Sequence, residues 1–434
     1  MAHSPAPLKK VLTSIHLWAI AVGLVISGEY FGWNYGWAVA GTGGLLVATV
    51  IVTILYVCLV FSFTELSTSI PNAGGPFAYA YKAMGATGGF FAGFATLFEF
   101  LLAAPAIAFA LGSYIHFLYP FIDIRLCAIV CYLIFTVINI AGIKESAVFT
   151  LIVTILAVAE LLIYMGIVAP HFEWKHFATD AFPFGAAGVF AALPFAIWLY
   201  LAIEGVAMVA EETKDPYRTI PRGYISGIVT LMFLALGVMI LTGGIGSWQS
   251  LSSIDYPLPE SIGRVLGKDN QLTRIFAGIG LFGLIASFHS IIIGYSRQIF
   301  ALARAGYLPK LLAKVNTKRQ TPDLALVAGG IVGIIAVLSG TTDKLILLSV
   351  LGALVMYILS MVSLFRLRKT APEMIRPFRA PFYPWFPMLA LLLSVLCLFA
   401  VIYFNWQLSL LFFLILIAAY IVFYVWQKQR RLLQ

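Results

Sequence analysis

Charged residues are the scarcest feature of this 434-residue sequence: Asp, Glu, Lys and Arg make up only 10% of it, whereas hydrophobic residues make up 62%. A soluble globule of this size could not hide so much apolar surface. The sequence also lacks the alternating apolar and polar pattern of membrane β-barrel strands, because its apolar segments are continuous. The composition therefore predicts an all-α integral membrane protein.

Groups that usually bind metals or perform catalysis are also few, with four cysteines and six histidines in the whole sequence. Cys127 and Cys131 share one helix face, but no histidine or carboxylate stands near them to complete a metal site. No nucleophile and general base form a recognisable pair. We therefore expect no metal, no cofactor and no enzymatic activity.

Segments long enough to cross about 30 Å of hydrocarbon recur along the chain. We place twelve of them, approximately at 15–38, 41–69, 87–118, 124–143, 146–169, 187–211, 223–245, 272–303, 324–340, 344–366, 384–404 and 407–427. No long linker or low-complexity block divides the sequence. Residues 1–434 are therefore predicted to form a single transmembrane domain.

Positive charge is distributed unevenly over the predicted connections. With the N-terminus in the cytoplasm, six of the 27 Lys and Arg residues fall outside, which leaves 21 inside. The six are Arg125, Lys175, Arg264, Lys268, Arg274 and Lys344. This ratio follows the positive-inside rule and predicts that both termini are cytoplasmic. It also accounts for the net charge of +9 through topology and membrane lipid, without nucleic acid.

Four carboxylates interrupt the apolar segments: Glu29, Glu99, Glu160 and Glu204. A carboxylate exposed to lipid costs on the order of 2.5 to 3.5 kcal/mol even on insertion scales. Four such residues indicate that something cationic meets them inside the protein. The pattern favours a pathway for an amine or a cation.

Two predicted helices carry breaks that combine glycine with one of these carboxylates. The first is at Ser27-Gly28-Glu29, and the second spans residues 201–205, downstream of Pro194. Glycine frees the backbone, so helices one and six could be unwound where two inverted copies of five helices meet. The alternative is that Gly28 and Gly205 only permit close helix packing.

Three segments carry a resemblance to a known family: residues 70–79, residues 211–222 and residues 296–309. Their order and spacing resemble the exits of helices two, six and eight in the amino acid-polyamine-organocation superfamily. Within it the sequence is most similar to bacterial ethanolamine permeases, through residues 23–33, 195–198, 202–207 and 294–307. The resemblance implies a multi-pass protein of the bacterial cytoplasmic (inner) membrane.

The resemblance also implies an architecture. It is the LeuT-type 5+5 inverted repeat with discontinuous helices 1 and 6. The repeats would cover about 15–169 and 187–366, and two additional helices would lie within 384–427.

A departure from the superfamily pattern bears on the substrate. Amino acid carriers of this family usually have Gly-Ser-Gly and an aliphatic residue in helix one, where free backbone amides bind the substrate carboxylate. This sequence has Ile26-Ser27-Gly28-Glu29 instead. Glu29 would repel a substrate carboxylate by roughly 4 kcal/mol at about 4 Å and an effective dielectric of about 20. We therefore expect an importer of ethanolamine or a similar small amine; the alternative is a polyamine or cationic amino acid transporter or exchanger.

The resemblance assigns substrate-binding roles to Ser27, Gly28, Glu29, Glu99, Trp198, Ala202 and Glu204. Trp198 matches an aromatic residue that closes over substrate in related proteins, and it would act as the gate and stack on a cation. Two alternatives stay open. Glu99 could be a protonated acid bonded to a carbonyl, and Trp198 could be an ordinary core aromatic.

Glu160, Glu204 and His289 are the candidates for coupling transport to an ion. Glu204 holds a position that is usually acidic in the family, and it could also tie helix six to the scaffold. Glu160 could bind a proton or cation, or pair with Ser287 or His289, and His289 could be a hydrogen-bonded structural residue. Proton and sodium coupling both remain open, and the sequence does not indicate an oligomeric state.

Overall fold

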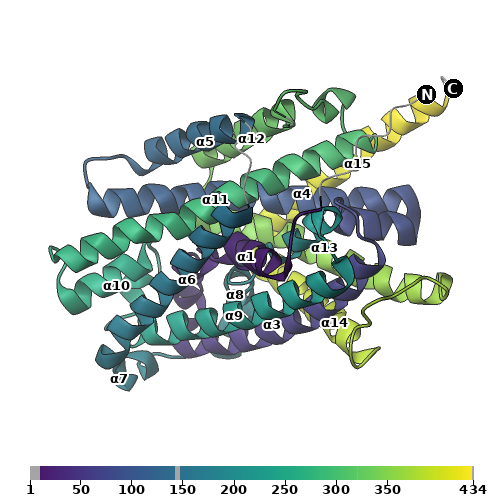
Figure 1. The fold of residues 1–434 in the computed structure, drawn as a ribbon. Coiled ribbons are helices and arrows are strands. Elements are labelled where there is room, and N and C mark those ends of the chain that lie inside the picture. The colour runs from purple at the N-terminus through teal and green to yellow at the C-terminus, as the bar shows by residue number, and fades with distance from the viewer. Residues whose placement is uncertain (1–9, 142–146, 320, 433–434) are drawn as a thin grey trace.

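The computed structural model describes residues 10–141, 147–319 and 321–432, and within them the fold is helical, without a named strand (Figure 1). The first half consists of α1 (Ser14–Val25), α2 (Ser27–Tyr30), α3 (Tyr35–Ser69), α4 (Pro76–Leu118), α5 (Ile124–Ile140), α6 (Ala147–Val168), η1 (Ala169–His171), α7 (Trp174–Ala178), α8 (Gly185–Trp198) and η2 (Ile203–Glu212). The second half consists of α9 (Pro216–Gly243), η3 (Gln249–Leu251), α10 (Pro257–Leu266), α11 (Gln271–Arg304), η4 (Lys310–Ala313), α12 (Asp323–Ser339), α13 (Thr342–Thr370), α14 (Trp385–Phe404) and α15 (Trp406–Leu432).

The helices have the length and composition of membrane spans. In the described parts of the chain, nine helical segments are long and apolar enough to cross a bilayer, and α1, α5 and α12 are shorter apolar helices. The nine long segments overlap nine of the twelve predicted spans, and the three shorter helices overlap the other three, of which α1 ends at Val25, well before the end of the predicted 15–38. The helices α3 and α4 begin earlier than the predicted spans 41–69 and 87–118. Non-helical backbone at Gly41 and Gly85 divides each of them into two helices close to the predicted starts. The prediction of an all-α membrane protein is confirmed.

The chain leaves the helical conformation near both predicted breaks, but neither Gly28 nor Gly205 is the residue that departs from it. Ile26 keeps helical dihedral angles, and Ser27, Gly28 and Glu29 form the short helix α2; the non-helical backbone follows over 31–34, where Gly32 has a φ of 92°. The second break lies between α8 and η2, where Ala202 has the left-handed φ of 75°. The expectation that Gly28 and Gly205 free the backbone is therefore wrong. Both glycines pack closely against other segments of the same chain, Gly28 against the backbone of Trp198 and Gly205 against the side chain of Leu24, as the packing alternative requires.

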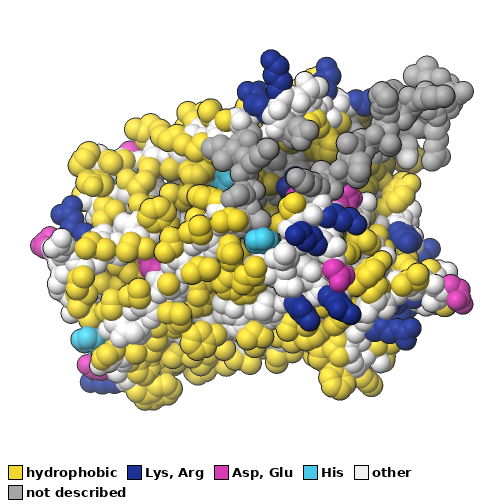
Figure 2. All heavy atoms as spheres, in the orientation of Figure 1, with side chains coloured by type: hydrophobic (Ala, Val, Ile, Leu, Met, Phe, Trp, Pro, Cys, Tyr) yellow, Lys and Arg dark blue, Asp and Glu magenta, His cyan; other side chains and the backbone are white. Residues whose placement is uncertain are grey.

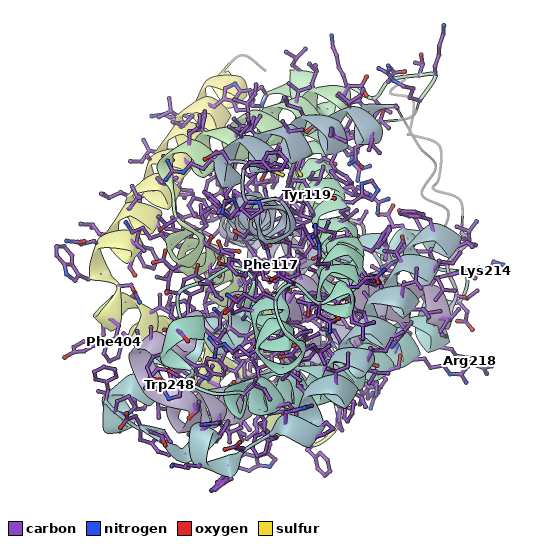
Figure 3. The ribbon with its side chains drawn as sticks, turned by 90° about the vertical axis from the view of Figure 1, so that its left-hand side faces the viewer. Phe117, Tyr119, Lys214, Arg218, Trp248 and Phe404 are labelled. Carbon is purple, nitrogen blue, oxygen red and sulfur yellow. The ribbon has the colours of Figure 1, made fainter. Side chains whose placement is uncertain are left out.

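Basic side chains gather toward one end of the bundle. In Figure 2 most visible Lys and Arg side chains lie at the right, and fewer lie at the left, where Figure 1 has α7 and α10. Lys214 and Arg218 are exposed and point outward from the bundle in Figure 3. This asymmetry is the one that the positive-inside argument uses. Which end faces the cytoplasm stays a prediction.

A buried ion-pair cluster closes the basic end. Glu65 of α3 receives two hydrogen bonds from Arg368 of α13, both 2.7 Å long, and a third of 2.7 Å from the backbone N–H of Ala380. Arg376 lies 3.5 Å from the same carboxylate and donates to four backbone carbonyls around it. Every oxygen lone pair of this carboxylate is engaged, so Glu65 fastens the connection between α13 and α14 to α3.

We expect Glu65→Gln to destabilise the protein by about 3 to 5 kcal/mol, because it leaves Arg368 and Arg376 without a buried counterion. The measurement is the thermal unfolding midpoint of the purified protein in detergent. Glu373→Gln is the matched control, since Glu373 is an exposed carboxylate in the same connection. Equal midpoints for the two variants would contradict the role of Glu65.

Candidate functional site

The two helix breaks touch each other at Gly28. A Cβ atom at this position would lie 2.5 Å from the carbonyl oxygen of Trp198 and 3.3 Å from Cα of Leu199. These neighbours are backbone atoms and cannot move aside as a flexible side chain could. Glycine is therefore required because α2 packs directly on the end of α8.

A small cavity lies beside this contact, between α1, α2, α4, α11 and the break after α8. Ser27, Trp198 and Ala202 line it, together with aliphatic side chains from the same elements. The volume open to the centre of a water molecule is about 10 Å³, which is about enough for one water. Three of the predicted site residues therefore meet at one cavity, and the structure is closed around it.

Trp198 lines the cavity and is held in place by Phe31, the residue that follows α2. Its indole N–H donates a 3.0 Å hydrogen bond to the carbonyl of Phe31, and the two rings meet edge to face at 5.5 Å. The side chain is 2% exposed. This position fits a lid that opens when α2 and α8 separate.

Ser27 is bonded to α11 on the wall of the cavity. Ser287 donates to the carbonyl of Leu24 at 2.7 Å, and its oxygen lies 2.8 Å from the Ser27 hydroxyl. Since Ser287 has one proton to donate, Ser27 is the donor of the second bond. The hydroxyl of Ser27 is thus directed toward α11 in this closed conformation.

Glu29 is buried but does not line the cavity. Successive helical residues are about 100° apart, so Ser27 and Glu29 point to nearly opposite sides of α2. The Glu29 side chain has no exposed surface, and within the described residues neither carboxyl oxygen has a hydrogen-bond partner. A carboxyl group in this state is expensive to bury and invites a cation or a proton.

Glu99 and Glu204 come together at the edge of the same cavity. Glu99 precedes Ala103, a cavity residue, by one helical turn, so both share a face of α4. Its carboxyl group lies beside that of Glu204 and the backbone of Ala202. Tyr357 donates a 3.0 Å hydrogen bond to Glu204, whereas the carboxyl oxygens of Glu99 make no hydrogen bond of good geometry within the described chain.

The other two coupling candidates lie elsewhere. Glu160 accepts a 2.7 Å hydrogen bond from Tyr30, and it makes none with Ser287 or His289, so that proposed pairing is wrong. Ser287 bonds to α1 and α2 instead, while His289 lies 3.1 Å from the amide of Asn139 on α5. Residues 287 and 289 face different neighbours because they are about 200° apart on α11.

Ionic and backbone contacts close the basic end below the site. Glu212 at the end of η2 forms a 3.2 Å ion pair with Arg297 of α11, and Glu211 accepts a hydrogen bond from the backbone of Ala73. The backbone N–H groups of Val11 and Leu12 both donate to the backbone carbonyl of Glu212, and these bonds hold the segment before α1 against the end of η2. Segments that resemble family signatures thus meet here.

Asp255 closes the opposite end, and the sequence analysis did not identify it. It lies between η3 and α10 and accepts hydrogen bonds from Tyr35 of α3 at 2.7 Å and Thr342 of α13 at 2.8 Å. Ser113 of α4 lies at 3.5 Å. An aspartate in a polar loop gives no sequence signal for this role. Only the fold brings three helix ends to one carboxylate.

Comparisons with known proteins give the chain its relatives. The sequence model of a family described as amino acid permease matches residues 12–429. The chain is 25% identical to a branched-chain amino acid permease of Bacillus subtilis, over 97% of this chain and 94% of that one. It is 28% identical to a methylthioribose transporter of Bacillus subtilis (88% and 86% covered) and to cationic amino acid transporter 1 of Arabidopsis thaliana (74% and 56% covered).

Gly32→Ala should dislodge the lid. Gly32 has a φ of 92°, and a Cβ atom there would collide with the indole of Trp198. Backbone strain and overpacking together should cost about 2 to 4 kcal/mol, seen as a lower thermal midpoint in detergent. Gly166→Ala is the control, because no atom lies within 4 Å of its added methyl group. If Gly32→Ala melts like Gly166→Ala, Trp198 is not held tightly.

Asp255 predicts a pH dependence of stability. Burial raises the pKa of Asp255 to about 6, although its hydroxyl partners oppose this shift. The folded protein therefore keeps a proton that the unfolded chain has lost above its ordinary pKa, and stability falls as pH rises through about 6. The effect is at most on the order of 3 kcal/mol.

The thermal midpoint in detergent, measured at pH 5 and pH 7.5, tests this. Part of the fall between these values should vanish in Asp255→Asn and persist in the control Asp269→Asn, an exposed aspartate nearby. The same fall in both variants would contradict the assignment.

Proposed function

The chain belongs to the amino acid permease family, and from this premise we propose that it is a secondary transporter that imports ethanolamine or a similar small primary amine. The family and the relatives are permeases and transporters, so the chain is a membrane transporter and not an enzyme. The proposal concerns the substrate, and it depends on the charges that surround the cavity.

One observation carries the proposal: a carboxyl group borders the cavity without a basic partner. Glu99 has no exposed surface, shares the cavity-facing side of α4, and has no ion pair with a described Lys, Arg or His. Glu65 shows the contrast, because this structural carboxylate is surrounded by two arginines. An ammonium group is the partner that Glu99 lacks. It would also find carbonyl oxygens at the two helix breaks.

Glu29 adds to this charge and argues against a substrate carboxylate. Two residues beyond Ser27, it stands where the superfamily resemblance implies an aliphatic side chain beside free amides. Fixed negative charge in a medium of low dielectric attracts an ammonium group and repels a carboxylate by several kcal/mol. An amino alcohol has the ammonium group that is attracted and lacks the carboxylate that is repelled, whereas a zwitterionic amino acid has both groups.

The proposed transport cycle uses the closures already described. Trp198 would cover the amine while Asp255 closes one end and the ion pair of Glu212 with Arg297 closes the other. We propose twelve crossings with inverted repeats over 15–169 and 187–366, in the inner membrane with both termini cytoplasmic. Separation of α2 from α8, which touch at Gly28, would then open the cavity to one side.

The second candidate is a transporter or exchanger of cationic amino acids or polyamines. The similarity to a plant cationic amino acid transporter favours it, and the same carboxyl groups could hold a side-chain cation. Bulky Ile26 beside the short helix and the small closed cavity favour a shorter substrate. Chain length and the presence of a carboxylate therefore distinguish the two candidates.

Uptake of labelled ethanolamine into proteoliposomes is the test. We expect saturable uptake that short amino alcohols inhibit, with alanine, arginine and putrescine as weak competitors. Transport of arginine or putrescine without ethanolamine would establish the second candidate. Transport of alanine without ethanolamine would refute the amine proposal.

Glu29→Gln should weaken ethanolamine binding about tenfold or more, equal to at least ~1.4 kcal/mol, because it removes a buried negative charge near the site. The measurement is the concentration of ethanolamine that half-saturates binding to the purified protein. Glu173→Gln, which changes an exposed carboxylate far along the chain, is the control. Unchanged affinity in Glu29→Gln would move the site away from α2.

A further inference from the structure

Two buried acids stand side by side where α4 meets the break before η2. The carboxyl groups of Glu99 and Glu204 are neighbours, and the two residues are 0% and 1% exposed. Within the described residues, neither carboxyl group forms an ion pair with a Lys, Arg or His. Two adjacent ionised carboxylates repel each other strongly in a dry interior, so such a pair holds a proton while the site is closed to water.

We propose that Glu99 and Glu204 share one proton and that this pair is the site where a proton enters the transport cycle together with the amine. The inference rests on the proposed function and deepens it, because it names the coupling ion. The singly protonated pair carries one negative charge, which matches the single positive charge of a primary ammonium group. The occupied site is then electrically neutral while the cavity is closed at both ends.

The positions of the two acids assign them different tasks. Glu99 faces the cavity through the face of α4 that carries Ala103, while Glu204 is turned toward α13 and receives the hydroxyl of Tyr357. When the ammonium group approaches Glu99, the O–H bond of Glu99 breaks and a new O–H bond forms on Glu204. The amine keeps its own proton, and Glu99 becomes its counterion. When the cavity opens to the other side, water reaches the pair, the amine leaves, and the O–H bond of Glu204 breaks as its proton passes to that water.

A chain of hydroxyl groups links Glu204 to the lid. The hydroxyl oxygens of Tyr357 and Tyr56 are 2.9 Å apart, and Tyr56 donates a 3.4 Å hydrogen bond to the carbonyl of Ile197, the residue before Trp198. Tyr357 donates to ionised Glu204 but must accept from protonated Glu204, which turns its own proton toward Tyr56. A change in the protonation of Glu204 therefore changes the hydrogen bonds of Tyr357 and Tyr56 up to the last turn of α8.

The groups around the pair are tyrosines rather than further acids or bases. Tyr56 comes from α3 and Tyr357 from α13, and Tyr224 of α9 donates to the backbone carbonyl of Glu204 at 3.3 Å. His289 on α11 faces Asn139 of α5 instead. Among the described residues, no further acid or base contacts Glu99 or Glu204 to compete for the shared proton.

The experiment compares gradient-driven accumulation with exchange in proteoliposomes, using labelled ethanolamine. In the wild type, an acidic exterior should drive accumulation, and a sodium gradient at equal pH should not. Glu204→Gln removes the group that takes up the proton, so accumulation should no longer respond to the pH gradient when it is measured relative to that variant's own exchange of internal for external ethanolamine. Glu99→Gln should lose the counterion and bind about tenfold more weakly or worse.

Glu160→Gln is the matched control, because it neutralises a buried acid that is bonded to Tyr30 and outside the pair. It should keep the response to the pH gradient. Infrared difference spectra provide a readout without transport: the change in the protonated-carboxyl band on addition of ethanolamine should be absent in Glu99→Gln and Glu204→Gln and remain in Glu160→Gln.

The outcomes separate this inference from the proposed function. Exchange in the wild type without any response to a pH gradient would overturn proton coupling and leave the amine transporter standing. A pH response that survives in Glu204→Gln, or that is lost only in Glu160→Gln, would overturn the assignment to the pair. Absence of ethanolamine exchange in a folded wild-type protein would refute the proposed function itself.

Discussion

Uncompensated carboxyl groups in an apolar interior are the constraint on which the rest of this structure depends. Burial makes each one costly unless hydrogen bonds, a counterion or a proton relieves it. The chain has a way to satisfy a structural carboxylate, as the two arginines around Glu65 demonstrate. Among the described residues, Glu29 and Glu99 have no hydrogen-bond partner for their carboxyl oxygens, and Glu204 has the hydroxyl of Tyr357 but no basic partner. We propose that this difference distinguishes carboxylates that hold the fold from carboxylates that bind a ligand.

Backbone packing brings these groups together. The approach of Gly28 to the carbonyl of Trp198 allows two helix ends to touch where each helix is interrupted. The touching ends place Ser27, Trp198 and Ala202 around one cavity, and the break at Ala202 turns Glu204 toward Glu99. A single close contact thus supplies both the lining of the site and its negative charge.

The two ends of the bundle are closed by different chemistry. Ion pairs and backbone hydrogen bonds from the segment around Glu212 close the basic end, and three hydroxyl groups on Asp255 close the other. Each closure joins elements far apart in the sequence through only a few polar contacts. In the proposed transport cycle the two closures open in turn, and few contacts must break each time.

The sequence alone determined the membrane environment, the helical class, the approximate positions of the apolar segments and the family resemblance, because continuous hydrophobicity and local motifs depend only on neighbouring residues. It also singled out the buried acids, since a carboxylate in an apolar run is anomalous wherever the chain folds. It could not tell that Glu160 bonds to Tyr30, that Glu99 lies beside Glu204, or that Glu29 points away from Ser27. It also missed Asp255 and Tyr357.

Only the tertiary structure decided these pairings, because they join residues about 80 to 150 or more positions apart and depend on how each helix is rotated about its axis. Hydrophobicity does not fix that rotation in a helix that is apolar on all sides. Side-chain packing does.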